Sequence, residues 1–372
     1  MPFRETVLLT GASGFVGREL LWRLARDPQV RTICLIRQGE ASADQRLRDL
    51  LGKAQLPPLG AEERSRCTAV AGDLTVERLG LSPATWEELA SQVTRIVHGA
   101  ASVDWAMPLA VARKINVEGT ARVLELAQTA RARGNLRAFD YLSTCYVCGK
   151  RTGLIPEDAL DGGQGFFNSY EQSKFEAEQL VRSSGLPYCI LRLSTVVGDS
   201  RTGYASTFKV MYWPLKMLAR GVARVVPADR GGIVDLVPVD YVCEALEAVA
   251  ASPSNRGKTF HLAAGPGCSS TIGEMVKLAA RCFHVAPPVL VPPVLFDLAV
   301  RPALSLAVWG KRRQLLNKGR IYRPYLAYRA SFDTARAFAV LEPLNISPPT
   351  VENYFQRLVD YALASDWGKR EV

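Results

Sequence analysis

The first apolar run of the chain and the turn after it read Thr6-Val-Leu-Leu-Thr-Gly-Ala-Ser-Gly-Phe-Val-Gly17. The aliphatic residues predict a short buried strand over 7–9, and the turn leads into a helix over 15–25. A diphosphate binds well to backbone N–H groups at a helix N-terminus, and glycines permit the close backbone approach. The stretch therefore predicts a dinucleotide site, with an ordinary glycine-rich turn as the alternative. The residues expected at the dinucleotide are Thr10, Gly11, Ser13, Gly14, Phe15, Val16 and Gly17.

The composition is that of a globular protein. The 372 residues are 48% hydrophobic and 22% charged, and their number exceeds one typical compact domain. No apolar run reaches the roughly 18 uncharged residues of a membrane span, so we expect no transmembrane helix. The first strand begins within about six residues of the N-terminus, so we also expect no leader. Eight cysteines, several inside apolar runs, predict reduced thiols and a cytoplasmic location.

The cysteines and histidines do not predict a metal site. Cys145 and Cys148 have CxxC spacing without a second pair, and the three histidines are far apart in the sequence. His98, at the end of an apolar run, is expected to pack and hydrogen-bond rather than to catalyse. We therefore expect no metal.

Positive charge is concentrated in one C-terminal stretch. The net charge is +10, and residues 298–332 contain no Asp or Glu. This stretch is either solvated surface or a docking patch for a phosphorylated carrier, an acidic protein or a peripherally touched membrane surface. We expect no nucleic acid as partner, because no recognised nucleic-acid-binding module accompanies the charge. The basic residues are Arg301, Lys311, Arg312, Arg313, Lys318, Arg320, Arg323 and Arg329.

The end of the second predicted strand, over residues 32–36, indicates which dinucleotide binds. In folds that read the ribose 2′-hydroxyl of NAD, an acidic residue lies about 20 residues beyond the glycines. This chain has Arg37 at that place. Because a guanidinium matches phosphate geometry, the sequence predicts NADPH. Arg46, on the following helix, is either a second clamp for the phosphate or a solvated charge.

Two further strand ends supply candidate cofactor contacts. Asp73, followed by Leu74, comes after the third predicted strand. Its carboxylate would either accept a hydrogen bond from adenine or cap its own loop. Ala100 and Ala101 end the fourth strand, and their small side chains let the backbone lie against the cofactor.

The alternation of elements predicts the fold class. Strand-like and helix-like segments alternate through residues 1–200, and apolar elements over about 233–265 are expected to return to the same sheet. We predict an α/β fold with a doubly wound, Rossmann-type parallel sheet that binds NADP. A smaller, mostly helical C-terminal subdomain over 201–372 would bind the substrate. Residues 284–310, apolar and rich in proline, are expected to form a lid or a partner surface.

Tyr170 and Lys174 lie four residues apart on a predicted helix, so they share one face. Reduction of a carbonyl by hydride requires a proton for the forming oxyanion, and a neighbouring ammonium would lower the tyrosine pKa from about 10. Thr144, at a strand end, would hydrogen-bond the substrate oxygen. Asn116, inside a helix predicted over 109–131, would hold a proton-relay water. A surface pair of Tyr and Lys is the alternative.

In combination, these motifs resemble the extended short-chain dehydrogenase/reductase superfamily over at least residues 5–265. Within it, the chain is similar to the thioester reductase-like and fatty acyl-CoA reductase branch. The motifs that carry the resemblance are Thr10–Gly17, Leu35–Arg37, Gly72–Thr75, Leu79–Ser82 with Trp86, His98–Val103, Asn116–Thr120, Ser143–Gly149, Tyr170 with Lys174, and Gly198–Gly203.

The resemblance implies that this chain catalyses the reaction that the enzymes of this branch catalyse. They reduce an acyl thioester, on coenzyme A or an acyl carrier protein, with NADPH to an aldehyde and sometimes on to the alcohol. Hydride attack makes a tetrahedral oxyanion, which Thr144 and Tyr170 would stabilise while the thiolate leaves. By the same resemblance, the diphosphate is held by Gly11, Gly14 and Gly17, the 2′-phosphate by Arg37 and adenine by Asp73, while Thr144, Tyr170 and Lys174 catalyse with Asn116 as a relay member.

The chain departs from the pattern after the sixth strand. Short-chain enzymes often have a proline there, whereas this chain has Ser194 and Thr195. Because the first strand opens the chain, we expect the thioester to arrive from elsewhere. Two alternatives stay open. One is a reductase or epimerase acting on a free ketone, a sterol or a nucleotide-sugar, and the other is a cofactor-binding sensor or scaffold without turnover.

Overall fold

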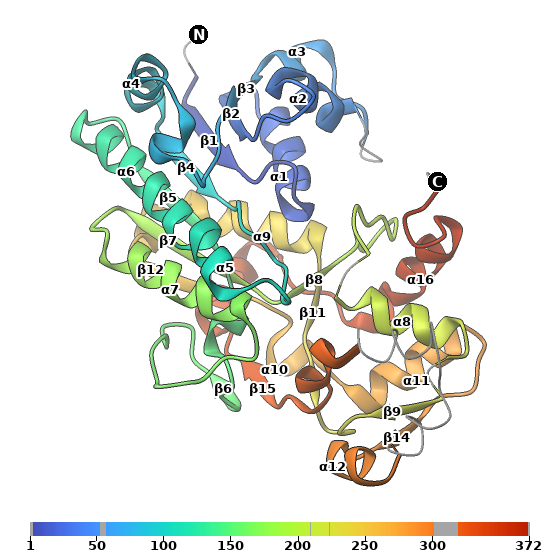
Figure 1. Ribbon diagram of the computed structural model, residues 1–372. Helices are drawn as coiled ribbons and strands as arrows, with labels where there is room; N and C mark the ends of the chain where they lie inside the picture. Colours follow the sequence, from blue (N-terminus) through green and yellow to red (C-terminus); the bar gives the residue numbers. More distant parts are fainter. Residues whose placement is uncertain (1–2, 53–56, 209, 223, 301–318, 371–372) are drawn as a thin grey trace.

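The computed structural model describes residues 3–52, 57–208, 210–222, 224–300 and 319–370 (Figure 1). Its central feature is a seven-stranded sheet in the order β12-β7-β5-β4-β1-β2-β3, in which every neighbouring pair is parallel. After β3 the chain crosses back to pair β4 with β1, and such a reversal of strand order marks the ligand crevice of an open α/β sheet. The strands are β1 (Glu5–Thr10), β2 (Val30–Ile36), β3 (Cys67–Ala71), β4 (Arg95–His98), β5 (Ala138–Thr144), β7 (Tyr188–Leu193) and β12 (Lys258–Leu262).

Helices cover both faces of the sheet, because successive strand residues enter two different apolar cores. Val7 and Leu9 pack with α1, α2 and α9, whereas Leu8 between them packs with α4, α6 and α7. This arrangement confirms the predicted α/β, doubly wound fold. The helices of the two layers are α1 (Phe15–Arg26), α2 (Ala43–Gly52), α4 (Pro83–Gln92), α5 (Leu109–Asn116), α6 (Glu118–Ala132), α7 (Ser169–Ser183) and α9 (Val239–Ala251).

A third apolar core lies in the C-terminal region. It is built from α8 (Tyr212–Ala219), α11 (Ile272–Cys282) and α16 (Phe355–Ala364), which Figure 1 shows grouped to one side of the sheet. The smaller helical subdomain is therefore confirmed, while the proposed boundary at residue 200 stays a prediction. Short strands form pairs here: β6 (Gly153–Ile155) with β15 (Ala330–Phe332), β8 (Thr195–Val197) with β11 (Leu236–Pro238), β9 (Val225–Pro227) with β14 (Val289–Val291), and β10 (Ile233–Val234) with β13 (Ser270–Thr271).

The last part of the chain returns to the first. β15 pairs with β6, and α15 (Ala335–Leu341) packs on α9 and β12. The buried carboxylate of Glu157 accepts hydrogen bonds from the backbone amides of His261, Arg336 and Ala337. The remaining short elements are α3 (Ala61–Ser65), α10 (Gly265–Cys268), α12 (Pro293–Leu295), η1 (Glu77–Gly80), η2 (Cys145–Cys148), η3 (Pro253–Asn255), η4 (Phe296–Val300), η5 (Gly319–Ala327), η6 (Glu342–Leu344) and η7 (Val351–Asn353).

The helix predicted over 109–131 is wrong as a single element. It is divided into α5 and α6 at Val117, and the hydroxyl of Thr120 donates there to the carbonyl oxygen of Asn116 at 2.6 Å. This side-chain donor occupies an acceptor that a continuous helix would offer to a backbone amide. The break places the side chain of Asn116 at the end of a helix.

Candidate active site

The glycine turn after β1 leaves space that side chains would fill. Gly11 has φ +81°, and a Cβ there would lie 2.7 Å from the amide nitrogen of Ala100. A Cβ on Gly17 would lie 2.1 Å from the carbonyl oxygen of Gly11, so α1 can pack against the turn only without one. Gly14 begins α1 with no side-chain cap, which leaves the first-turn amides available to an anion. The turn therefore fits the diphosphate of a dinucleotide.

Thr10 supports this turn from behind. Its hydroxyl accepts the amide of Ala100 at 3.2 Å and lies 2.6 Å from Nδ1 of His98. The buried side chain thus contacts the loop that faces the glycines, and a contact from Thr10 to the dinucleotide stays a prediction. The other predicted residues at the turn, Ser13, Phe15 and Val16, are exposed or half-buried, as are Ala100 and Ala101 in the facing loop.

The predicted adenosine contacts lie at the ends of β2 and β3. Arg37 is exposed just beyond β2, and Arg46 on α2 donates to the carbonyl oxygen of Arg37. Oδ1 of Asp73 accepts both the amide and the hydroxyl of Thr75 at 2.8 Å, so the loop-cap alternative describes that oxygen. Burial would raise the pKa of Asp73, but these bonds and the nearby charge of Arg37 lower it. Leu74 packs against α6 at Gly119. A Cβ added to Gly119 would lie 2.9 Å from the Cβ of Leu74.

The carboxyl end of β5 and the first turn of α7 bring Thr144 and Tyr170 together. Asn168 caps α7 by accepting the amide of Glu171 at 3.0 Å, which places Tyr170 in the first turn. Burial raises the pKa of Tyr170 to about 12, and the nearby hydroxyl of Thr144 opposes this rise. The phenol is thus a proton donor at neutral pH, held beside a second hydroxyl.

Lys174 is buried one turn along α7, but its partner is not Tyr170. Its ammonium donates to the hydroxyl of Tyr141 at 2.7 Å and to the carbonyl oxygen of Leu142 at 2.8 Å. Burial lowers the pKa of Lys174 to about 7, partly offset by the charge of Glu178. The expectation that lysine lowers the tyrosine pKa is therefore wrong for this structure. The physical reason is that burial dominates both groups and the ammonium is anchored on β5.

Tyr141 is the residue that the sequence analysis missed. Burial raises the pKa of Tyr141, and the nearby hydroxyl of Thr120, which lies 3.0 Å from Nε2 of His98, opposes this rise. A buried polar chain therefore leads from Lys174 through β5 and β4 to Thr10. Burial lowers the pKa of His98 to about 3, so the imidazole is neutral and serves as a hydrogen-bonding residue, as expected. The pattern of the β5 strand gave no signal for Tyr141, because it matches an ordinary buried aromatic.

Asn116 joins two segments beside the catalytic helix. Its Oδ1 accepts the amide of Ser102 at 2.8 Å, and its Nδ2 donates to the carbonyl oxygen of Ser102 and to the hydroxyl of Ser173. The hydroxyl of Ser173 in turn donates to the carbonyl oxygen of Tyr170. Asn116 thus ties the loop after β4 to α7, and its relay role stays a prediction.

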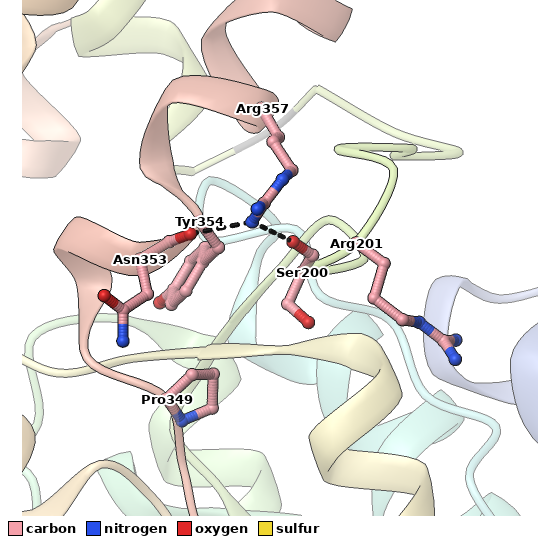
Figure 2. A pocket seen from close by; sticks show the side chains of 6 residues that line it. All are labelled: Ser200, Arg201, Pro349, Asn353, Tyr354 and Arg357. Atoms are coloured by element: carbon pink, nitrogen blue, oxygen red, sulfur yellow. Dashed lines mark hydrogen bonds between the residues drawn. The ribbon is translucent and has the colours of Figure 1, made fainter.

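A pocket of about 240 Å³ lies away from these residues, between the loop after β8 and the start of α16 (Figure 2). Arg357 crosses its upper side and donates to the carbonyl oxygens of Ser200 and Asn353. The predicted site residues do not line this pocket, which is formed by Ser200, Arg201, Pro349, Asn353, Tyr354 and Arg357.

Three residues of the basic stretch belong to the described part of the chain. Arg323 lies 2.5 Å from Asp297, and Arg329 lies 2.6 Å from Asp229, whereas Arg320 is exposed. The remaining five, Arg301, Lys311, Arg312, Arg313 and Lys318, lie outside the described residues. Of the helices that the structure does describe, none has the length and hydropathy that crossing a membrane would need. In the same residues, no cluster of three or more His, Cys, Asp or Glu could hold a metal.

The family model described as male sterility protein, an NAD-binding domain, matches residues 9–246. The chain belongs to this family. The match covers more than half of the chain and includes the glycine turn, the β5 end and the α7 helix. It confirms the resemblance to the thioester reductase-like branch and supports an oxidoreductase with a nicotinamide cofactor.

Individual relatives agree with the family. The chain is 36% identical to the nonribosomal peptide synthetase asaC of Aspergillus flavus, over 70% of this chain and 26% of that protein. It is 27% identical to the putative fatty acyl-CoA reductase CG8303 of Drosophila melanogaster, over 64% of this chain and 50% of that protein. Among solved structures, the terminal R domain from the myxalamid PKS-NRPS biosynthetic pathway superposes with a TM-score of 0.84 at 28% identity, covering 100% of this chain and 94% of that one. This chain thus spans half or less of these two relatives' own length.

Proposed function

We propose that this chain reduces an acyl thioester with NADPH to an aldehyde, and that a second reduction of the same kind gives the alcohol. The observation that carries the proposal is that Thr144, at the carboxyl end of β5, and Tyr170, in the first turn of α7, lie close enough for the Thr144 hydroxyl to lower the pKa of Tyr170. The glycine turn lies at the same edge, where ligands bind in folds of this kind. The match to nonribosomal peptide synthetases and a fatty acyl-CoA reductase supports a thioester as substrate.

Both hydroxyl groups would act on the substrate oxygen. A bound reduced nicotinamide supplies a hydride, and attack on the thioester carbon turns the carbonyl oxygen into an oxyanion. Thr144 and Tyr170 would donate hydrogen bonds to that oxygen as the charge develops. A phenol with pKa about 12 holds its proton at this stage, so the oxyanion can collapse and expel the thiolate. In aldehyde reduction no group leaves, and Tyr170 would instead transfer its proton to the alkoxide.

The preference for NADPH is argued from Arg37. Its exposed guanidinium follows β2, at the place where the ribose 2′ position lies in dinucleotide folds. Arg46 holds the backbone of Arg37 and so fixes the loop that presents it. A 2′-phosphate would find a cation there and no carboxylate before Glu40. The family to which the chain belongs is described as NAD-binding, so the preference for NADPH over NADH is part of the proposal.

The test is product analysis with the purified chain. It would be incubated with NADPH and a panel of acyl-coenzyme A and acyl-carrier-protein thioesters, with a ketone and a nucleotide-sugar as rival substrates. We expect thioester-dependent NADPH oxidation with an aldehyde or alcohol as product, reduced at least about 100-fold in Tyr170→Phe. Tyr188→Phe, at the opposite end of β7, is the matched control and should keep the activity. NADPH oxidation with the ketone alone, or none with any substrate, would overturn the proposal.

A further inference from the structure

Tyr325 reaches from η5 to the first turn of the helix that bears Tyr170. Nδ2 of Asn168 donates to the hydroxyl of Tyr325 at 2.6 Å, and that hydroxyl donates to Oε1 of Glu171. Asn168 is the cap residue of α7, and Oε2 of Glu171 accepts the amide of Phe167 at 2.9 Å. One phenol from the C-terminal region therefore contacts both side chains that fix the start of α7.

The ring of Tyr325 is fixed as firmly as its hydroxyl. It lies 4.6 Å from the ring of Trp105 in the loop after β4, and 5.8 Å from that of Tyr146, two residues beyond Thr144. The ring of Phe167 lies 5.5 Å away on a third side. Aromatic contacts of this kind hold a ring in one orientation. The cluster therefore joins the loop after β4, the end of β5, the start of α7 and η5 around one side chain.

We propose that Tyr325 is a positioning residue for the reduction, which sets the first turn of α7 so that Tyr170 meets the oxygen that Thr144 also contacts. This inference rests on the proposed function. Asn168 and Glu171 flank Tyr170 on both sides, and Glu171 is only 1% exposed. Loss of the Tyr325 hydroxyl would leave the buried carboxylate of Glu171 with one donor fewer. It would also leave the side-chain amide of Asn168 without this acceptor. The first turn would then relax, although the rest of α7 stays packed.

Tyr328 provides a matched control. It lies in the same aromatic cluster, with its ring 6.1 Å from that of Tyr325, and it is buried where Tyr325 is half-buried. Its hydroxyl donates to the carbonyl oxygen of Gly149 at 2.6 Å and lies 3.0 Å from Sγ of Cys148, so its partners are not on α7. Tyr325→Phe and Tyr328→Phe therefore each remove one hydrogen-bonded hydroxyl and keep the ring, but only the first removes a contact with the cap of α7.

The experiment compares both variants with the unaltered chain in steady-state kinetics and amide hydrogen exchange. We expect Tyr325→Phe to lower kcat roughly tenfold while KM stays within about twofold, because orientation is lost and binding is kept. Exchange should accelerate in residues 167–172. Tyr328→Phe should leave both kcat and this exchange unchanged.

The exchange measurement separates this inference from the proposed function. If no thioester is reduced by the unaltered protein, the proposed function fails, and faster exchange confined to Tyr325→Phe would still show positioning. Equal kinetics and equal exchange in the unaltered protein and Tyr325→Phe would overturn the inference. Equal losses in Tyr325→Phe and Tyr328→Phe would overturn it as well, since they would indicate only general support by the cluster.

Discussion

The ammonium nitrogen of Lys174 lies 2.7 Å from the hydroxyl oxygen of Tyr141 on the neighbouring strand. Lys174 also donates to the carbonyl oxygen of Leu142, so the lysine is anchored between α7 and β5. Burial lowers the pKa of Lys174 to about 7, so at neutral pH its charged and neutral forms are populated to a similar extent. The lysine is thus poised to change charge where the proposed reaction takes place.

This buried lysine should make stability depend on pH. Its folded pKa, about 7, lies below its ordinary value of 10.5, so between these values the unfolded chain binds more protons than the folded one. The free energy of unfolding contributed by Lys174 should therefore rise as pH increases from 7 to 10.5, by up to about 1.4 kcal/mol per pH unit.

The measurement is chemical denaturation at several pH values in this window, for the unaltered protein and for Lys174→Met. We expect the unfolding free energy of the unaltered protein minus that of Lys174→Met to rise with pH across this window. Lys216→Met, on helix α8, serves as the control for charge removal. The same difference in unfolding free energy should change less with pH for this variant. A difference that stays constant or falls across the window would contradict the assigned pKa.

Gly17→Ala should impair dinucleotide binding through the turn itself. The added Cβ would lie 2.1 Å from the carbonyl oxygen of Gly11, and backbone cannot give way as a flexible side chain can. We expect a loss of about 1–3 kcal/mol in unfolding free energy and at least tenfold weaker dinucleotide binding. Calorimetry and fluorescence titration would measure both. Gly267→Ala, where a Cβ meets open space, should change neither quantity. A Gly17→Ala variant with the stability and dinucleotide affinity of the unsubstituted protein would refute the role of the turn.

Arg37→Ala should shift cofactor preference. A charge-assisted hydrogen bond contributes about 1.5–3 kcal/mol, so NADPH affinity should fall roughly 10- to 100-fold while NADH affinity hardly changes. Titration with both nucleotides gives the ratio directly. Arg48→Ala is the control, because Arg48 donates to Gln45 on the same helix. Equal weakening of both nucleotides by Arg37→Ala would exclude recognition of the 2′-phosphate.

The buried ion pair of Glu178 on α7 with Arg192 on β7 should matter more to stability than the exposed pair that α7 forms with α5. Both side chains are fully buried at a distance of 2.7 Å, and Ser143 also donates to Glu178. Glu178→Ala should cost about 3–5 kcal/mol in unfolding free energy, because it strands a buried guanidinium. Glu176→Ala breaks the exposed pair with Arg113 and should cost at most about 1 kcal/mol. Denaturant titration compares the two, and similar costs would contradict the assignment.

Local patterns predicted the sheet and the turn well. Glycine spacing, apolar runs and alternating elements depend on residues close together in the chain, and the third strand lies at Cys67–Ala71 as expected. The sequence also placed Thr144 at the end of a strand and Tyr170 on the following long helix, where the structure has them.

The sequence could not show which groups share a hydrogen bond across elements. Lys174 and Tyr141 meet because the register between α7 and β5 places them together, and no spacing in the chain encodes that register. Thr120, whose hydroxyl donates at the helix break near Val117, looks like any helical threonine. Tyr325 lies 154 residues from Glu171, so their contact is visible only in three dimensions.

The returning strand β12 has a practical consequence for anyone who wishes to exchange reductase modules. It fills the edge position beside β7, and α15 from the far end of the chain packs against it. A splice at residue 200 would strip β7 of its hydrogen-bonding neighbour and leave an unsatisfied strand edge, a known starting point for aggregation. Chimaeras should therefore transfer the whole segment from β1 through α15 together.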